Sequence, residues 1–171
     1  MAHKHFSDRR VTIVWPDVAD MDGYQALPGY FICCCLAGEA TGILPHQGMT
    51  NLQVAGIDAV PRTTKRFNRS QLNILAGGGI WFLSQDAQSG LIFTRHAVTS
   101  APYDDINQRE EMITRNVDDI SFYFLDVFSP YIGISNVTVS LLTALQAEIN
   151  AAKKELTGRN FVSAWAPSSS I

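Results

Sequence analysis

Long apolar runs and a signal-peptide core are both absent from this sequence. No run approaches the ~20 apolar residues that span a bilayer, and the first six residues, Met-Ala-His-Lys-His-Phe, contain no apolar core. We therefore expect that the protein is made in a cytoplasm and that it does not insert into a membrane.

An excess of positive charge is also missing. Lys and Arg number 13 against 16 Asp and Glu, which gives a formal net charge of -3. Phosphate contacts dominate the affinity of proteins for nucleic acids, and they need a broad cationic surface. We expect no nucleic-acid partner.

Cysteine is scarce, and its three copies are consecutive: Cys33, Cys34 and Cys35. Neighbouring cysteines form a disulfide only with strain. On a helix their side chains point about 100° apart and cannot converge on one metal ion. We expect no disulfide framework and no metal, and we interpret the three as small buried hydrophobic residues.

Motifs for catalysis and for cofactors are missing as well. The glycines at 77–79 lack the Lys-Ser/Thr pair of a phosphate-binding loop, and no Gly-x-Ser-x-Gly elbow occurs. A triad of Ser84, His96 and Asp105 would have to be assembled without any such motif. We expect no cofactor and no enzyme, and a small hydrolase using His96 is kept only as an alternative.

What the sequence does contain is enough apolar material for one core. Its 171 residues are 46% hydrophobic, which suits one domain of ordinary size. We predict a single domain over residues 10–158. An N-terminal arm (1–9) and a polar C-terminal tail (159–171) flank it, and the tail is a possible exchange arm.

Local patterns predict one layered domain of the α/β class, in the broad sense of a mixed α+β fold. A central sheet containing a β-hairpin is flanked by a buried helix and by a C-terminal pair of long helices. The predicted elements are a strand (11–15), the buried helix (30–40), a loop with one or two short strands (43–68), a helix capped by Ser70 (71–76), the hairpin (80–85 and 91–96) and a first long helix (107–128).

The second long helix carries its apolar face on Leu141, Leu145, Ile149, Ala152 and Leu156. Asn136 stands shortly before it and is the predicted N-cap. The first long helix is predicted to begin with a capping box at residues 107–110 and to end at Ser129-Pro130.

An ordered series of short motifs resembles the carboxy-terminal conserved domain of contractile-phage tail sheath proteins. The resemblance covers nearly all of residues 10–156, and the order of the motifs carries it more than any single one. They are Thr94-Arg95-His96-Ala97-Val98-Thr99, Arg109-Glu110, Thr114-Arg115-Asn116-Val117-Asp118, Tyr131-Ile132-Gly133 and Ser135-Asn136-Val137-Thr138, preceded by Val14-Trp15-Pro16, Pro28-Gly29-Tyr30, Ala37-Gly38 and residues 45–51.

The resemblance implies a structural subunit of a contractile tail. Such subunits form hexameric rings stacked helically around an inner tail tube, and contraction drives the tube into the cell. The implied partners are copies of the chain, the tube protein, the baseplate and the tail terminator, in a virion tail assembled in the host cytoplasm. A nonpolymerising tail or baseplate adaptor is the alternative.

The resemblance also directs attention to particular residues. Polar residues of the shared motifs either form an internal network that fixes the hairpin against the first long helix or contact other subunits: Arg95, His96, Arg109, Glu110, Arg115 and Asn116. Lys153 and Lys154 are the expected tube-facing residues, because sheath–tube contact in the family is largely electrostatic. Residues 2–8 and 161–171 are the candidates for strands added to a neighbour's sheet.

Overall fold

The computed structural model describes residues 7–60, 67–133, 136 and 138–165, and the chain divides into two compact units, Met1–Thr114 and Arg115–Ile171. The boundary falls within helix α5 (Glu111–Phe128). One domain over residues 10–158 therefore stays a prediction, and each unit is described by itself.

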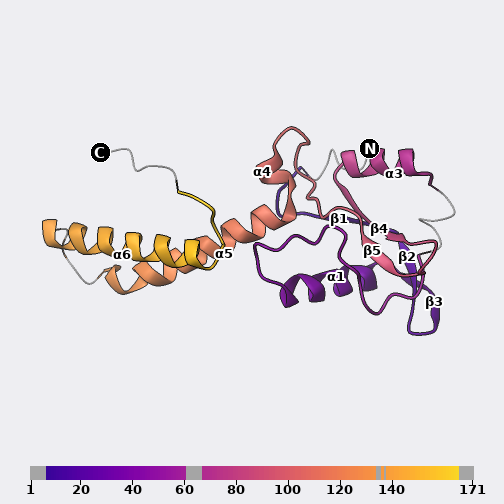
Figure 1. Cartoon of the computed structure of the whole chain (residues 1–171), viewed down its shortest axis with the longest axis horizontal. Coiled ribbons are helices and arrows are strands. Elements are labelled where there is room, and N and C mark those ends of the chain that lie inside the picture. Colours follow the sequence, from indigo (N-terminus) through magenta and orange to yellow (C-terminus); the bar gives the residue numbers. More distant parts are fainter. Residues whose placement is uncertain (1–6, 61–66, 134–135, 137, 166–171) are drawn as a thin grey trace. The chain divides into compact units, whose positions relative to one another are not determined.

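The first unit is built on a three-stranded sheet (Figure 1) with the order β1 (Ile13–Trp15), β4 (Ile80–Gln85) and β5 (Ile92–Thr94). β1 runs parallel to β4, and β5 runs antiparallel to it. The predicted first strand and the predicted hairpin are confirmed, although the second hairpin strand ends at Thr94 and not at residue 96.

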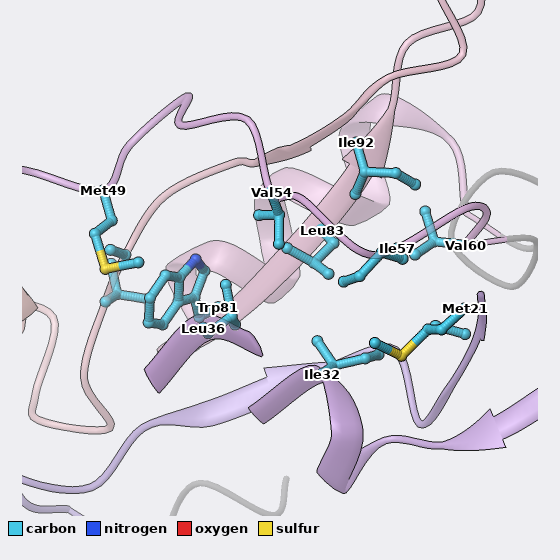
Figure 2. Packing of buried hydrophobic residues seen from close by; sticks show 13 residues of the cluster. Met21, Ile32, Leu36, Met49, Val54, Ile57, Val60, Trp81, Leu83 and Ile92 are labelled. Atoms are coloured by element: carbon cyan, nitrogen blue, oxygen red, sulfur yellow. The ribbon is translucent and has the colours of Figure 1, made fainter. Parts of the chain in front are cut away.

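Strand β4 is buried on both faces, in agreement with its unbroken apolar run Ile80–Leu83. Trp81, Phe82 and Leu83 are at most 5% exposed. Successive side chains of a strand point to opposite faces, so both faces are covered. Figure 2 shows Trp81 and Leu83 within the main core cluster, which also contains Ile32, Leu36, Met49, Val54, Ile57 and Val60.

Helix α1 (Tyr30–Gly42) covers the sheet with one face only. Ile32 and Leu36 are its buried residues, whereas Cys33 and Cys34 are exposed. The predicted burial was therefore wrong for the outer face of the helix and for Cys33 and Cys34, whereas Cys35 is partly buried and packs against the core. A helix that is apolar all round gives no sign of which face packs. The pKa of the Cys35 thiol is raised, mainly by partial burial and secondly by the electrostatic effect of Cys34. A raised pKa disfavours the reactive thiolate form.

A second hairpin, β2 (Val18–Met21) with β3 (Tyr24–Pro28), was missed in the sequence. Its turn has positive φ at Asp22 (49°) and Gly23 (78°), the pattern of a type I′ turn for which Asp-Gly is a strong signal. β3 is mostly exposed, so it shows no apolar alternation. Pro28 ends this strand and does not begin α1.

The loop that follows α1 runs along the outer edge of β5. The Asn51 amide donates to the Thr94 carbonyl (2.8 Å), the Thr94 amide to Leu52 (2.9 Å) and the Val54 amide to Ile92 (2.9 Å). One or two short strands were predicted in this loop. In residues 43–60 the structure has only isolated β-bridges, Gln53 with Phe93 and Ala59 with Asp20. Residues 61–66 lie outside the described part. β5 is thus covered on its outer edge.

Helix α3 (Arg69–Gly77) begins at a capping box that uses Asn68, and the prediction of Ser70 as the cap was wrong. The Asn68 side chain accepts from the Gln71 amide and the Gln71 side chain accepts from the Asn68 amide, both at 2.9 Å. A capping box needs Glu or Gln three residues after the cap. Gln71 has this position relative to Asn68, whereas the residue three after Ser70 is Asn73.

The first long helix is interrupted, contrary to the prediction. α4 (Ile106–Arg109) is capped by Asp105, whose carboxylate accepts from the Asn107 amide (3.0 Å). Glu110 then leaves helical geometry with ψ 119° and bridges Val98, and α5 starts after it. The capping-box pattern at 107–110 therefore does not cap a helix, since Glu110 is engaged by a strand-like segment.

The second unit contains the rest of α5, a 3-10 turn (Ser129–Tyr131) and α6 (Val139–Gly158). The Tyr123 hydroxyl on α5 donates to Glu155 on α6. Asn136 is not the N-cap of α6: the Thr138 hydroxyl accepts from the Leu141 amide (3.2 Å), and Asn136 stands two residues too early for this bond.

The first part of the C-terminal tail packs back on these helices. The Trp165 indole donates to the Thr157 hydroxyl (3.0 Å), and its ring lies edge-on to Phe124. The Asn116 amide donates to the Phe161 carbonyl (2.9 Å). Residues 166–171 lie outside the described part.

Two glycines with positive φ offer a matched test of the first unit. A Cβ at Gly79 (φ +79°) would lie 2.9 Å from the Thr99 carbonyl oxygen, whereas one at Gly90 (φ +72°) would meet nothing within 4 Å. Each Ala substitution costs roughly 1 kcal/mol of backbone strain. We expect chemical denaturation to show that Gly79→Ala loses at least about 1 kcal/mol more than Gly90→Ala; equal losses would contradict the close approach.

The Tyr123–Glu155 contact predicts a pH dependence in the second unit. The hydrogen bond to Glu155, followed by partial burial, raises the pKa of the Tyr123 phenol. The raised pKa stabilises the fold fully below the ordinary tyrosine value of about 10, and this contribution is lost as pH rises through the raised pKa. In a spectrophotometric titration, Tyr123→Phe should remove the last part of the tyrosinate signal, and Glu155→Gln should move that part to lower pH. An unchanged alkaline limb in both variants would contradict the bond.

Candidate functional site

The segment after β5 is tied to the break between α4 and α5. The Thr99 amide donates to the Arg109 carbonyl (2.7 Å), and the Glu111 amide donates to the Ala97 carbonyl (3.3 Å). His96 and Glu110 are brought to the same place by this pairing. The interruption of the helix thus serves to position a charged side chain beside the hairpin.

His96 and Glu110, two of the six predicted network residues, contact each other through their side chains. The His96 Nε2 atom lies 2.9 and 3.0 Å from the two carboxylate oxygens of Glu110. The side chains are 35% and 20% exposed, so the pair is half-buried. Such a pair contributes on the order of 1 kcal/mol, which suits a local clamp.

Arg109 lies at the other side of the same segment. Its guanidinium carbon stands 3.8 Å from the centre of the Tyr103 ring, a cation–π contact. One guanidinium nitrogen is 3.5 Å from the Ala76 carbonyl oxygen at the end of α3, which is a weak hydrogen bond at most. Arg109 therefore joins α4 to the end of α3.

Arg95 differs from its neighbours. Within the described part of the chain its guanidinium has no hydrogen-bond or ion-pair partner, although the residue is half-buried. It lines a pocket of about 360 Å³, which we call the Arg95 pocket; the other lining residues are Thr50, Asn51, Asn73, Ala76 and His96.

The last two predicted network residues belong to the second unit. Arg115 and Asn116 follow on α5, and Asn116 holds the tail through Phe161. The expected tube-facing lysines are in the same unit. Lys154 is exposed, whereas Lys153 is half-buried with its ammonium 5.6 Å from the centre of the Trp165 ring. Their role toward a tube stays a prediction.

The sheet leaves one edge open within the described residues. β1 is an outer strand of the sheet, and no described strand pairs with its other side. Beside it lies a mostly apolar groove of about 250 Å³ between β1 and α1, which we call the β1 groove; it is lined by Thr12, Val14, Cys33, Leu36, Ala37, Ala40, Trp81 and Glu111. Sequence reasoning missed this site, because only the strand order reveals which edge is free.

The residues of the hypothetical triad are not brought together. Asp105 caps α4, His96 faces Glu110, and Ser84 lines a separate pocket beside Asp86 and Phe93. In the described ranges, no three His, Cys, Asp or Glu side chains are close enough to hold a metal ion, and no described helix has the length and apolarity to cross a membrane.

Solved structures of contractile particles share this fold. The helical sheath of the anti-feeding prophage in its contracted state matches with a TM-score of 0.71 at 18% identity, over 90% of this chain and 42% of that chain. A chain of the baseplate of the same particle matches with a TM-score of 0.70 at 18% identity, over 88% of this chain and 40% of that one. The sheath tail protein Lin1278 from Listeria innocua matches with a TM-score of 0.66 at 13% identity, over 84% and 34%.

The chain has a sheath-protein fold. The predicted resemblance to tail sheath proteins and the mixed α+β class are thereby confirmed at the level of the fold. The chain spans about two fifths or less of the length of these sheath-fold proteins. No protein-family model and no curated protein sequence matches it.

The His96–Glu110 clamp can be measured by a double-mutant cycle with His96→Gln and Glu110→Gln. We expect a coupling free energy of about 1 kcal/mol in chemical denaturation, because the pair is half-buried and both carboxylate oxygens are close. The exposed Arg159–Glu155 pair (2.8 Å) is the matched control, and its coupling should stay below about 0.5 kcal/mol. Equal couplings would show that the position of His96 beside the helix break adds nothing.

Proposed function

We propose that this chain is a non-enzymatic structural subunit that assembles with copies of itself into the contractile tail sheath of a bacteriophage or a phage-like injection machine. The sheath fold supports this proposal, and so does the open edge of β1 beside an apolar groove. Unpaired sheet edges are sites at which another chain can add a strand. The β1 groove is the single feature on which the proposal depends most.

An extended segment of a neighbouring copy is the proposed occupant of the β1 groove. Its main chain would pair with β1, and every second side chain would enter the groove between Val14 and Ala37. Parts of the predicted arms are already engaged within the chain, since the Asp8 amide donates to Ser100 (3.2 Å) and Trp165 packs on α6. Residues 2–6 and 166–171 remain the candidate arms, and they lie outside the described part.

In the proposed assembly, head-to-tail contacts between copies close into a ring where the rotation from copy to copy closes, and continue as a helix where it does not. We propose hexameric rings, stacked in a helix around an inner tail tube, whose contraction drives the tube into the cell. The tube would meet Lys153 and Lys154, and the ends of the sheath would meet the baseplate and the tail terminator. The location is the virion tail, assembled in the host cytoplasm.

A nonpolymerising baseplate adaptor is the second candidate. The match to a chain in the structure of the anti-feeding prophage baseplate favours it, because that structure is of a baseplate. An adaptor would bind one heterologous partner through the β1 groove and would not stack on itself.

The β1 groove gives a direct test of self-assembly. Ala37 is exposed and lines the groove, so Ala37→Glu puts a charge in the way of an added strand without disturbing the core. Gly38→Glu is the control, since Gly38 is exposed on the same helix, does not line the groove and has nothing within 4 Å of an added Cβ. By negative-stain microscopy we expect tubes or rings for the wild type and for Gly38→Glu, and at least about tenfold fewer for Ala37→Glu.

All three proteins must be fully folded at the temperature of assembly, which thermal melting checks; the control gains some stability because Gly38 lies inside α1. A wild type that stays monomeric at every concentration and salt would contradict the sheath proposal, and binding to a purified baseplate under the same conditions would favour the adaptor. Unimpaired assembly of Ala37→Glu would show that the β1 groove is not the contact.

A further inference from the structure

The Arg95 pocket is assembled from three separate parts of the first unit. Thr50 and Asn51 come from the loop along β5, Asn73 and Ala76 from α3, and Arg95 and His96 from the end of the hairpin. Each part is held by its own bonds: the Asn51 amide on Thr94, the capping box of α3, and the His96–Glu110 clamp. The pocket is therefore a fixed feature of the fold and needs no rearrangement to form.

Hydrogen-bond donors dominate its lining. The Arg95 guanidinium carries five N–H donors in a planar fork, and the amides of Asn51 and Asn73 and the Thr50 hydroxyl can donate as well. None of the lining residues in the described part of the chain is acidic. The closest carboxylate that the contacts identify, that of Glu110, is held by His96, and Arg109 adds a second positive charge near Ala76.

The half-buried guanidinium of Arg95 is left without a described protein partner by this arrangement. Arg is enriched where protein partners meet because its planar fork donates two parallel hydrogen bonds to a carboxylate. The volume of about 360 Å³ exceeds what a lone carboxylate needs and leaves room for the side chain that carries it.

We propose that the Arg95 pocket binds the carboxylate of an Asp or Glu side chain presented by a neighbouring copy of this chain. The proposal rests on the self-assembly proposed above and adds a second contact, separate from the β1 groove. The chain itself supplies the ligand chemistry, since its acidic residues outnumber its basic ones by 16 to 13. Among the lining residues one guanidinium stands with neutral amides, and Arg109 lies beside them; this local charge suits a carboxylate better than the phosphates of a nucleic acid, which call for a broad cationic surface.

The pocket can be tested apart from assembly by NMR titration of the full ¹⁵N-labelled chain at a concentration at which it is monomeric. N-acetylglutamate α-amide, whose only carboxylate is that of its side chain, is the probe, and N-acetylglutamine α-amide is its uncharged match. We expect saturable shifts of the Arg95 Nε–H and Asn73 side-chain signals with the first probe only. Arg95→Gln should weaken binding of the probe about tenfold or more, because a charge-assisted bond is lost.

Arg69→Gln is the matched control, since Arg69 is exposed at the start of α3 and does not line the pocket. It should leave the affinity for N-acetylglutamate α-amide unchanged. Shifts that do not saturate, equal affinity in Arg95→Gln, or tighter binding of inorganic phosphate than of N-acetylglutamate α-amide would each overturn the proposal.

Microscopy of the same variants identifies the source of the carboxylate. Tubes that form for the wild type and for Arg69→Gln, but are at least about tenfold fewer for Arg95→Gln, support a neighbouring copy. Tubes that form equally well for all three overturn this proposal and leave the proposed function intact. If the wild type binds the probe saturably but forms no tubes, the proposed function is rejected. A neighbouring copy is then also rejected as the source of the carboxylate.

Discussion

Burial of β4 on both faces is the constraint from which most of the first unit follows. Trp81 and Leu83 require an apolar cover on one side and Phe82 on the other, because leaving any of them in water costs on the order of 2 kcal/mol. Ile32 and Leu36 of α1 and the buried residues of the loop at 49–60 join Trp81 and Leu83 in one core. That loop also hydrogen-bonds β5, so the same cover that completes the core closes one edge of the sheet.

Local signals in the sequence were sufficient where one segment determined the outcome. The hairpin of β4 and β5 and the long part of α5 lie where a hairpin and the first long helix were predicted. Predictions failed where a distant segment competes with the helix for the same backbone. Glu110 leaves helical geometry because it forms a β-bridge with Val98. The caps at Asn68 and Thr138 were misassigned because several residues able to cap stand within a few positions of each helix start.

The candidate sites divide in the same way. His96, Glu110, Arg95 and Arg109 were all selected from the sequence, and the structure gives them different roles: a clamp, a cation–π contact and a pocket. The β1 groove and the lining of the Arg95 pocket depend on strand order and on contacts between segments more than 40 residues apart. Apolarity and motif spacing carry no information of that kind.

Coverage of β5 by the chain's own loop leaves the sheet with a single open side in the described residues. A sheet with two free sides can grow without limit, as in amyloid, and offers no defined number of neighbours. One free side allows this three-stranded sheet to accept one incoming strand. Links made through this sheet would therefore have a direction, and an additional strand would find no second free edge on it.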